Sequence, residues 1–403
     1  MSDAAAATCL PRPQPLGVFP LPAGYLLIGE GSTHDEIRHQ LTSGKLPEEF
    51  PESLRFYQLA LDGHLEKATE AIVGTDAISA ANRLVLDPSN DHFELALEAA
   101  SVSGDKALQA FVDTMGFIIG LVARPADATN TDGEFAALVY ATQATLAMEQ
   151  DDVVAASKLL EEAAKSAEPV SRALAGQLLG QLANAQVEEG EAKQATATIQ
   201  VALEMLGETD LGLNRAELHV AAGAMFQERS ESHPRYMEEA IIHYHQAMEL
   251  VTIDSGPEIF ATANANMGLA YLTMSMEETS DELRIGTAVE KMRKALQVFR
   301  PDAHPTRWSS TQLNLANALV YLPSKHQAKN IVEAVDLYQQ VLEHREGDAI
   351  GRARVLANQG NALTRLGEPD QAIDRLTEAK AVFVQHADTE AAAAVQVVLD
   401  SVA

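Results

Sequence analysis

The residues best suited to chemistry are two histidines in a short polar stretch, HDEIRH, which begins at His34 and ends at His39. A helical zinc site needs two histidines four residues apart, which places them about 40° apart around the helix axis. Here the spacing is five residues, which separates the two rings by about 140° at about 100° per residue. We therefore predict no metal site at this pair.

Three other motifs imitate sites of known chemistry but lack an essential residue. The stretch NTDG at residues 130–133 is similar to part of a calcium loop, but Ala128 and Val139 occupy the first and last positions, where carboxylates are required. Residues 29–31 (GEG) lack the third glycine of a dinucleotide loop, and Cys9 has no neighbouring base. We predict no catalytic residue and no cofactor, and we expect that the protein is not an enzyme.

The composition narrows the class of protein and of partner. The 403 residues include 58 acids against 29 bases, which gives a net charge of −29. Such a surface repels phosphate backbones and acidic lipids, so neither nucleic acid nor membrane is an expected partner. A single cysteine excludes a disulfide scaffold. The first ten residues hold no basic residue and no long apolar run, so no secretory signal is predicted and the cytoplasm is the expected location.

The chain contains an internal repeat that places small residues at regular positions. A triplet with i, i+4, i+7 spacing, led by alanine, recurs six times at intervals of 38 to 48 residues. Its members are Ala156/Leu160/Ala163, Ala195/Ile199/Ala202, Ala240/Tyr244/Ala247, Ala288/Met292/Ala295, Ala334/Tyr338/Val341 and Ala372/Leu376/Ala379. The predicted helix before each triplet carries a matching small residue. These residues are Ala144, Ala183, Gly223, Gly268, Ala316 and Gly360. Small residues let two helices cross closely, so this pattern predicts six helical hairpins over residues 133–380.

The last unit, ARVLANQGNALTRLGEPDQAIDRLTEA at residues 353–379, resembles the tetratricopeptide repeat (TPR) family. The residues that carry the resemblance are Asn358, Gly360, Asn361, Ala362, Gly367, Ala372, Ile373 and Ala379, with MGLAY at 267–271 and NLANAL at 314–319. The units are longer than the usual family period of about 34 residues. The resemblance implies an all-α, right-handed superhelical array of antiparallel hairpins, a TPR-like solenoid whose first helices line a concave groove.

Asparagines recur in two registers of the predicted first helices. One register holds Asn266, Asn314 and Asn358, and the other holds Asn184, Asn317 and Asn361. An amide both donates and accepts hydrogen bonds, so such a ladder can pair with the main chain of an extended peptide. Alternatively, the asparagines bond to neighbouring turns and belong to the repeat itself.

Two arginines, Arg354 and Arg365, add positive charge to the last unit and are suited to an acidic side chain or a terminal carboxylate. The carboxylate clamp of the family needs basic residues and asparagines over three units. Thr262 and Ser310 stand in the two preceding units where Arg354 stands in the last. The clamp is therefore not reproduced.

The remaining parts of the chain flank the array. Residues 1–23 are predicted to form an extended, proline-rich arm that is either free or docked, with Pro11, Pro13, Pro15, Pro20 and Pro22. Residues 24–51 contain GYLLIG, a short strand or a buried extended plug, followed by a short helix. Residues 52–125 are predicted as divergent hairpins that turn at Gly63 and Gly104, and residues 381–403 as a capping helix.

These observations favour a non-catalytic interaction scaffold or assembly chaperone that holds a partner peptide segment in its concave groove. The alternatives are a peptide-sensing signal receptor and an enzyme with a site near residues 24–51. Open ends of the array also allow a homo-oligomer. The sequence does not name the partner.

Overall fold

The computed structural model describes residues 10–231, 233, 235–274, 281–344 and 347–402. These residues form nineteen α-helices joined by turns and short 3-10 helices, with no strand among them. The predicted all-α fold is confirmed. Cys9 and the first eight residues of the predicted arm lie outside the described residues.

The chain divides into two compact units, Met1–Met225 and Phe226–Ala403. The division falls inside α11 (Gly212–Glu228), so the hairpins predicted over residues 133–380 are shared between the units. The helices of unit 1 are α1 (His34–Thr42), α2 (Arg55–Leu61), α3 (Leu65–Glu70), α4 (Ala77–Leu86), α5 (Asn90–Ser103), α6 (Lys106–Ile118), α7 (Gly133–Glu149), α8 (Val153–Ala167), α9 (Arg172–Glu188) and α10 (Ala192–Leu206).

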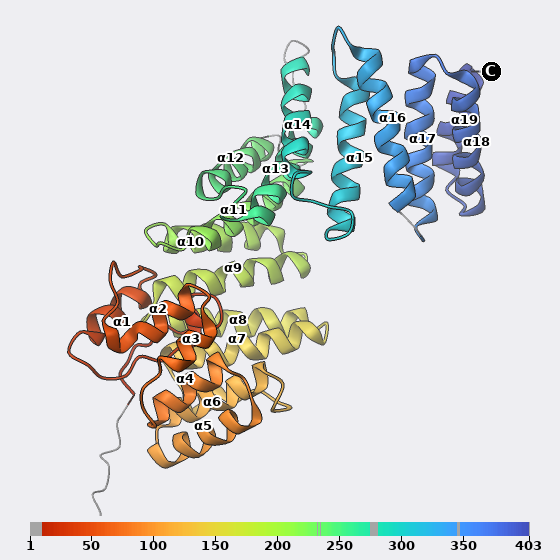
Figure 1. The fold of residues 1–403 in the computed structure, drawn as a ribbon. Helices are drawn as coiled ribbons and strands as arrows, with labels where there is room; N and C mark the ends of the chain where they lie inside the picture. The colour runs from red at the N-terminus through yellow and green to blue at the C-terminus, as the bar shows by residue number, and fades with distance from the viewer. Residues whose placement is uncertain (1–9, 232, 234, 275–280, 345–346, 403) are drawn as a thin grey trace, which may run out of the picture. The chain divides into compact units, whose positions relative to one another are not determined.

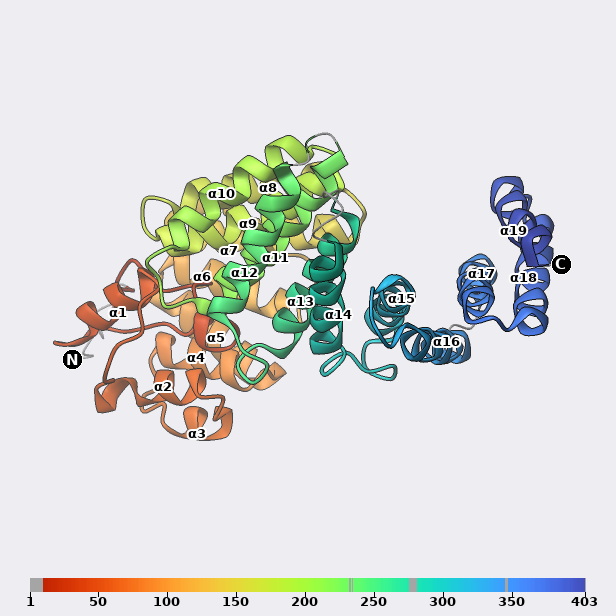
Figure 2. The ribbon, with the colours of Figure 1, turned by 90° about the horizontal axis from the view of Figure 1, so that it is seen from above.

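Unit 2 repeats the same antiparallel pairing, and each helix contacts the next one along the chain from α13 to α19 (Figure 1; Figure 2). Its helices are α12 (Arg235–Leu250), α13 (Pro257–Thr273), α14 (Asp281–Ala295), α15 (Pro305–Tyr321), α16 (Gln327–His344), α17 (Ala349–Leu366), α18 (Pro369–Gln385) and α19 (Thr389–Val402). The last of these matches the predicted terminal helix, and its Ala392 and Val395 pack into the core of unit 2.

Small residues lie where the helices of a pair cross, as the repeat predicted. All six leading alanines, from Ala156 to Ala372, are 0% exposed. A Cβ added to Gly360 of α17 would lie 2.6 Å from Cγ of Leu376 in α18, and one added to Gly268 of α13 would lie 2.9 Å from Cγ of Met292 in α14. A larger residue at either glycine would push the paired helices apart.

The two weaker hairpins of unit 1 also form. Gly63 separates α2 from α3 and Gly104 separates α5 from α6, and both glycines have a positive φ. Such a backbone conformation is readily available to glycine and rare for other residues. The turns predicted at these two glycines are therefore confirmed.

The predicted N-terminal arm needs a correction. Its described part is neither free nor fully extended: Leu16 and Val18 are fully buried in the core of unit 1, and the chain turns back so that the amide of Gly17 donates to the carbonyl oxygen of Gly24 over 2.7 Å. The prolines left a free arm and a docked arm open, and the docked alternative holds for the described part because the apolar residues between the prolines bury enough surface to order it. Of the two alternatives for GYLLIG, the structure supports the buried plug and not the strand, because Leu26 to Ile28 are fully buried and form no strand.

Candidate peptide-binding surfaces

Each first helix of a pair carries four positions that share one side of the helix, away from the small residue at the crossing. They lie six and two residues before, and one and five residues after, the small residue at the crossing. At about 100° per residue these positions fall between about 100° and 160° from the crossing residue. We call this side the register face. In unit 2 it comprises Thr262, Asn266, Leu269 and Thr273 of α13, Ser310, Asn314, Asn317 and Tyr321 of α15, and Arg354, Asn358, Asn361 and Arg365 of α17.

Seven of the eight residues predicted to bind a partner therefore share the register face of unit 2. The asparagines among them are half-buried, and Arg354 and Arg365 are exposed. The eighth, Asn184, is exposed at the equivalent position of α9 in unit 1. The predicted residues thus occupy two separate bodies of the chain.

Part of the asparagine ladder is used inside the fold. Oδ1 of Asn317 accepts a hydrogen bond from the hydroxyl of Tyr338 over 2.6 Å and another from Nδ2 of Asn358 over 3.1 Å. Asn266 bonds to the hydroxyl of Tyr244, whose pKa is raised by burial and lowered in part by this bond. Tyr338 lies on α16, the second helix of the same pair as Asn317, and Tyr244 lies on α12, the helix that precedes α13. These asparagines therefore also tie neighbouring helices together.

Three other predicted residues keep their polar groups available. The side chains of Asn314, Asn361 and Arg354 make no hydrogen bond or ion pair with any other described residue. The guanidinium of Arg365 lies over the Tyr321 ring, 4.4 Å from its centre, at the end of α15. The register face of unit 2 therefore offers unused amide and guanidinium groups.

The charge of this face differs from that of the rest of the chain. About one residue in seven of the chain is acidic, but α15 and α17 contain no Asp or Glu at all. They carry arginines instead, of which Arg354 and Arg365 lie on the register face. Arg307 of α15 is paired with Glu258 of α13. The second helices α14, α16 and α18 hold both charges. The register face of these two first helices thus carries two arginines and no carboxylate in a strongly acidic protein.

The register face of unit 1 is partly covered by the chain itself. Gln177 of α9, at the position equivalent to Arg354, donates from Nε2 to the carbonyl oxygens of Gly17 and Val18 over 3.3 Å and 2.8 Å. Our sequence analysis missed Gln177, although its register was available. It also missed Glu134 of α7, which is fully buried and pairs with Arg12.

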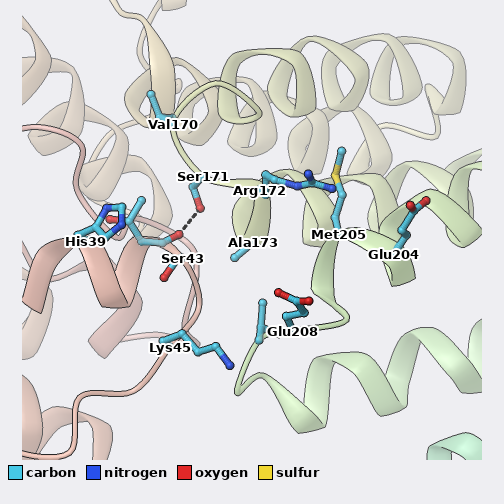
Figure 3. Close-up of a pocket in the computed structure, with 12 residues that line it drawn as sticks. His39, Ser43, Lys45, Val170, Ser171, Arg172, Ala173, Glu204, Met205 and Glu208 are labelled. Atoms are coloured by element: carbon cyan, nitrogen blue, oxygen red, sulfur yellow. Dashed lines mark hydrogen bonds between the residues drawn. The ribbon is translucent and has the colours of Figure 1, made fainter.

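A cavity of about 660 Å³ lies beside the C-terminal end of α1 in unit 1 (Figure 3). Lys45 and Arg172 contribute positive groups to its wall, Glu204 and Glu208 contribute negative ones, and His39 contributes its imidazole ring. The hydroxyl of Ser171 donates to the carbonyl oxygen of Thr42, and that of Ser43 donates to the carbonyl oxygen of Gln40, so neither is bonded to a general base. The balance of charges favours no single class of ligand.

The alternative of a site in residues 24–51 has little support from the geometry. The ring of His34 bonds to the carbonyl oxygen of Gly29 over 2.9 Å and to Oγ of Ser53 over 2.7 Å, whereas His39 lines the cavity beside α1. Within the described ranges no group of three or more potential metal ligands gathers, and no helix is long and apolar enough to cross a membrane.

No protein-family model matches the chain, and no curated protein matches it. Several solved structures do. A tetratricopeptide repeat protein from Parabacteroides merdae is 16% identical, with 65% of this chain and 91% of that chain covered and a TM-score of 0.41. The Cut9–Hcn1 hetero-tetramer of APC/C is 15% identical over 93% of this chain and 63% of that chain, with a TM-score of 0.49. YrrB, a TPR protein with an unusual peptide-binding site, is 16% identical over 52% of this chain and 87% of that chain, with a TM-score of 0.37.

The buried alanines and close crossings of consecutive antiparallel helices characterise the fold. It is a TPR-like array of helical hairpins. At these identities the likeness to the solved structures concerns the type of fold, and the partner has to be argued from the surfaces of this chain.

Proposed function

We propose that the protein is a non-catalytic interaction scaffold that holds an extended, acidic segment of a partner protein on the register face of unit 2. The observation that carries this proposal is the combination of unused amides with a strip free of carboxylates on α15 and α17. A chain with a net charge of −29 would be expected to place acids there, unless the surface serves an anionic ligand.

The main chain of the partner would pair with Asn314 and Asn361, since a side-chain amide can donate to a carbonyl oxygen and accept from an N–H group. Each such bond contributes about 0.5–1.5 kcal/mol, because it replaces a bond to water. Carboxylates of the partner would pair with Arg354 and Arg365, which lie at opposite ends of the same helix face. The amides would thus supply affinity for any extended segment, and the arginines would select acidic ones.

The test is a selection of random peptides displayed on phage against the whole protein. We expect the recovered peptides to be enriched in Asp and Glu, with binding that weakens as salt is added. The variant Asn314→Ala/Arg354→Glu should bind them at least about tenfold more weakly, because one amide and one charge-assisted bond are lost and a like charge is introduced. Neither residue bonds within the described fold, so the variant should remain folded.

The matched control is Lys329→Glu/Gln385→Ala, which makes the same types of change at exposed residues of the second helices α16 and α18. It alters the net charge equally and should leave the peptides bound. Recovered peptides without acidic residues, or equal binding to the two variants, would remove the register face of unit 2 as the binding surface.

A further inference from the structure

The N-terminal segment, residues 10–28, makes contacts of the kind that a groove makes with a peptide. Its charged end is Arg12, which donates from Nε and Nη2 to the two carboxylate oxygens of Glu134 over 3.0 Å and 2.9 Å. The backbone N–H group of Gln14 donates a third hydrogen bond to the same carboxylate over 3.0 Å. This bonding raises the pKa of Arg12 above its usual value, so its guanidinium stays charged at any pH at which the protein is folded.

Side-chain amides of unit 1 form hydrogen bonds with the main chain of the same segment. Asn82 of α4 accepts from the N–H group of Leu27 over 2.7 Å and donates to its carbonyl oxygen over 2.8 Å, which satisfies both backbone groups of an extended residue. Gln177 of α9 donates to the carbonyl oxygens of Gly17 and Val18. This is the mode of recognition expected of an asparagine ladder, with glutamine and asparagine on different helices.

The apolar side chains of the segment fill the space between these polar contacts. Five of them are fully buried: Leu16, Val18, Leu26, Leu27 and Ile28. The segment also approaches α9 closely, because a Cβ added to Gly17 would lie 3.0 Å from Cδ1 of Leu174. Residues 29–33, which join the segment to α1, are by contrast mostly exposed.

We propose that the N-terminal segment is an intramolecular peptide ligand of unit 1, and that the surface formed by Asn82, Glu134, Leu174 and Gln177 is a peptide-binding groove which the chain closes with its own end. The groove is specific for an arginine followed two residues later by a free main-chain N–H group, and for an extended aliphatic stretch. It binds residues 10–28 equally when they belong to a separate chain. This inference is independent of the function proposed for unit 2.

The experiment uses the whole chain with a protease site inserted between Glu30 and Ser32. After folding and cleavage, the segment is expected to stay bound without a covalent link. A labelled synthetic peptide of residues 10–28 is then expected to exchange into the groove. Its Arg12→Ala form should bind about tenfold or more weakly, since it leaves Glu134 without its cationic partner. The Leu21→Ala form, changed at a side chain that is 52% exposed, should bind as well as the original.

Circular dichroism of the cleaved protein shows whether the segment is a ligand of unit 1 or a structural part that unit 1 needs in order to fold. A protein that keeps its helices, releases the segment and takes it back supports the proposal. A protein that loses the helices of unit 1 on release and does not take up the peptide overturns it, as does equal binding of the Arg12→Ala form. The acidic peptides selected on unit 2 should bind the cleaved protein unchanged, so that a failure here leaves that proposal intact.

Discussion

Gln177 in unit 1 and Arg354 in unit 2 hold the same position on the first helix of their hairpins, yet their surroundings differ. Gln177 bonds to two carbonyl oxygens of the N-terminal segment, whereas Arg354 is exposed and bonds to no described residue. The charges around them differ in the same way. In unit 1 a buried carboxylate, Glu134, receives an arginine, while the first helices α15 and α17 of unit 2 hold arginines and no carboxylate.

This difference indicates that the repeat provides a common surface, and that a few residues on this surface set the charge of the ligand it prefers. The hairpins of both units are built on the same buried alanines, so the scaffold itself has no preference for a cationic or an anionic ligand. The preference comes from a few residues on the register face and at the helix ends. Unit 1 has an occupant within the chain that carries Arg12, and we propose that unit 2 takes an anionic one.

The largest expected effect concerns the apolar part of the N-terminal segment. Leu27→Ala should lower the free energy of unfolding of unit 1 by about 2–5 kcal/mol, because a fully buried side chain is lost. Amide hydrogen exchange in α7 and α9 should report this loss, while exchange in α15 and α17 should not change. Leu21→Ala is the control and should alter the free energy by less than about 0.5 kcal/mol. Equal acceleration in both units would show that they do not unfold independently.

The second prediction concerns the crossing of the last hairpin in unit 2. Gly360→Ala should destabilise unit 2 by about 1–3 kcal/mol, because the new methyl group would overlap the side chain of Leu376. Gly286→Ala in α14 is the matched control, since an added Cβ there meets no atom within 4 Å. In a helix it should be neutral or stabilising by up to about 1 kcal/mol. Urea unfolding measures both, and a Gly360→Ala protein as stable as the control would contradict the close crossing.

The third prediction compares asparagines at equivalent positions of the two units. Asn317→Ala removes the acceptor of the Tyr338 hydroxyl and should cost about 1–2 kcal/mol, because a largely buried hydroxyl loses its partner. Asn184→Ala, at an exposed position of α9, should change the free energy of unfolding by less than about 0.5 kcal/mol. Equal effects would mean that Asn317 is no more structural than Asn184 and would return it to the binding surface.

The hairpins were predictable because their signal is local. Two helices that cross closely need small residues at the crossing. The triplet led by alanine at i, i+4, i+7 spacing shows this pattern within two turns of a single helix. All six leading alanines are 0% exposed in consequence. The turns at Gly63 and Gly104 were predictable for a similar reason, since each glycine separates two short helical patterns.

The N-terminal segment was only partly predictable because its order depends on distant residues. Arg12 pairs with Glu134 and Val18 with Gln177, more than a hundred residues away in each case. Its proline content matched a free arm, and only the aliphatic stretch at Leu26 to Ile28 indicated burial. A structural role of the asparagines was left open from the sequence, but the partners of Asn317 were not identified because they lie on two other helices, and its binding role stays a prediction.

The smallest expected effect is a difference between the two units in how their stability depends on pH. In unit 2 the ring of His243 stacks on Phe226 at 5.4 Å, and burial lowers its pKa from 6.5 while the nearby Glu239 offsets part of the shift. The fold therefore favours the neutral ring. Its contribution to stability is fully present above about pH 6.5, the value of the unfolded chain, and is lost as the pH falls towards the lower value of the folded state.

Urea midpoints of unit 2 should accordingly fall between neutral pH and about pH 5, by an amount that the variant His243→Phe reduces, since phenylalanine keeps the stacking and does not titrate. The free energy of unfolding of unit 1 should lack this particular contribution, because the ring of His243 belongs to unit 2. If His243→Phe leaves the pH dependence of unit 2 unchanged, carboxylates rather than this histidine set it.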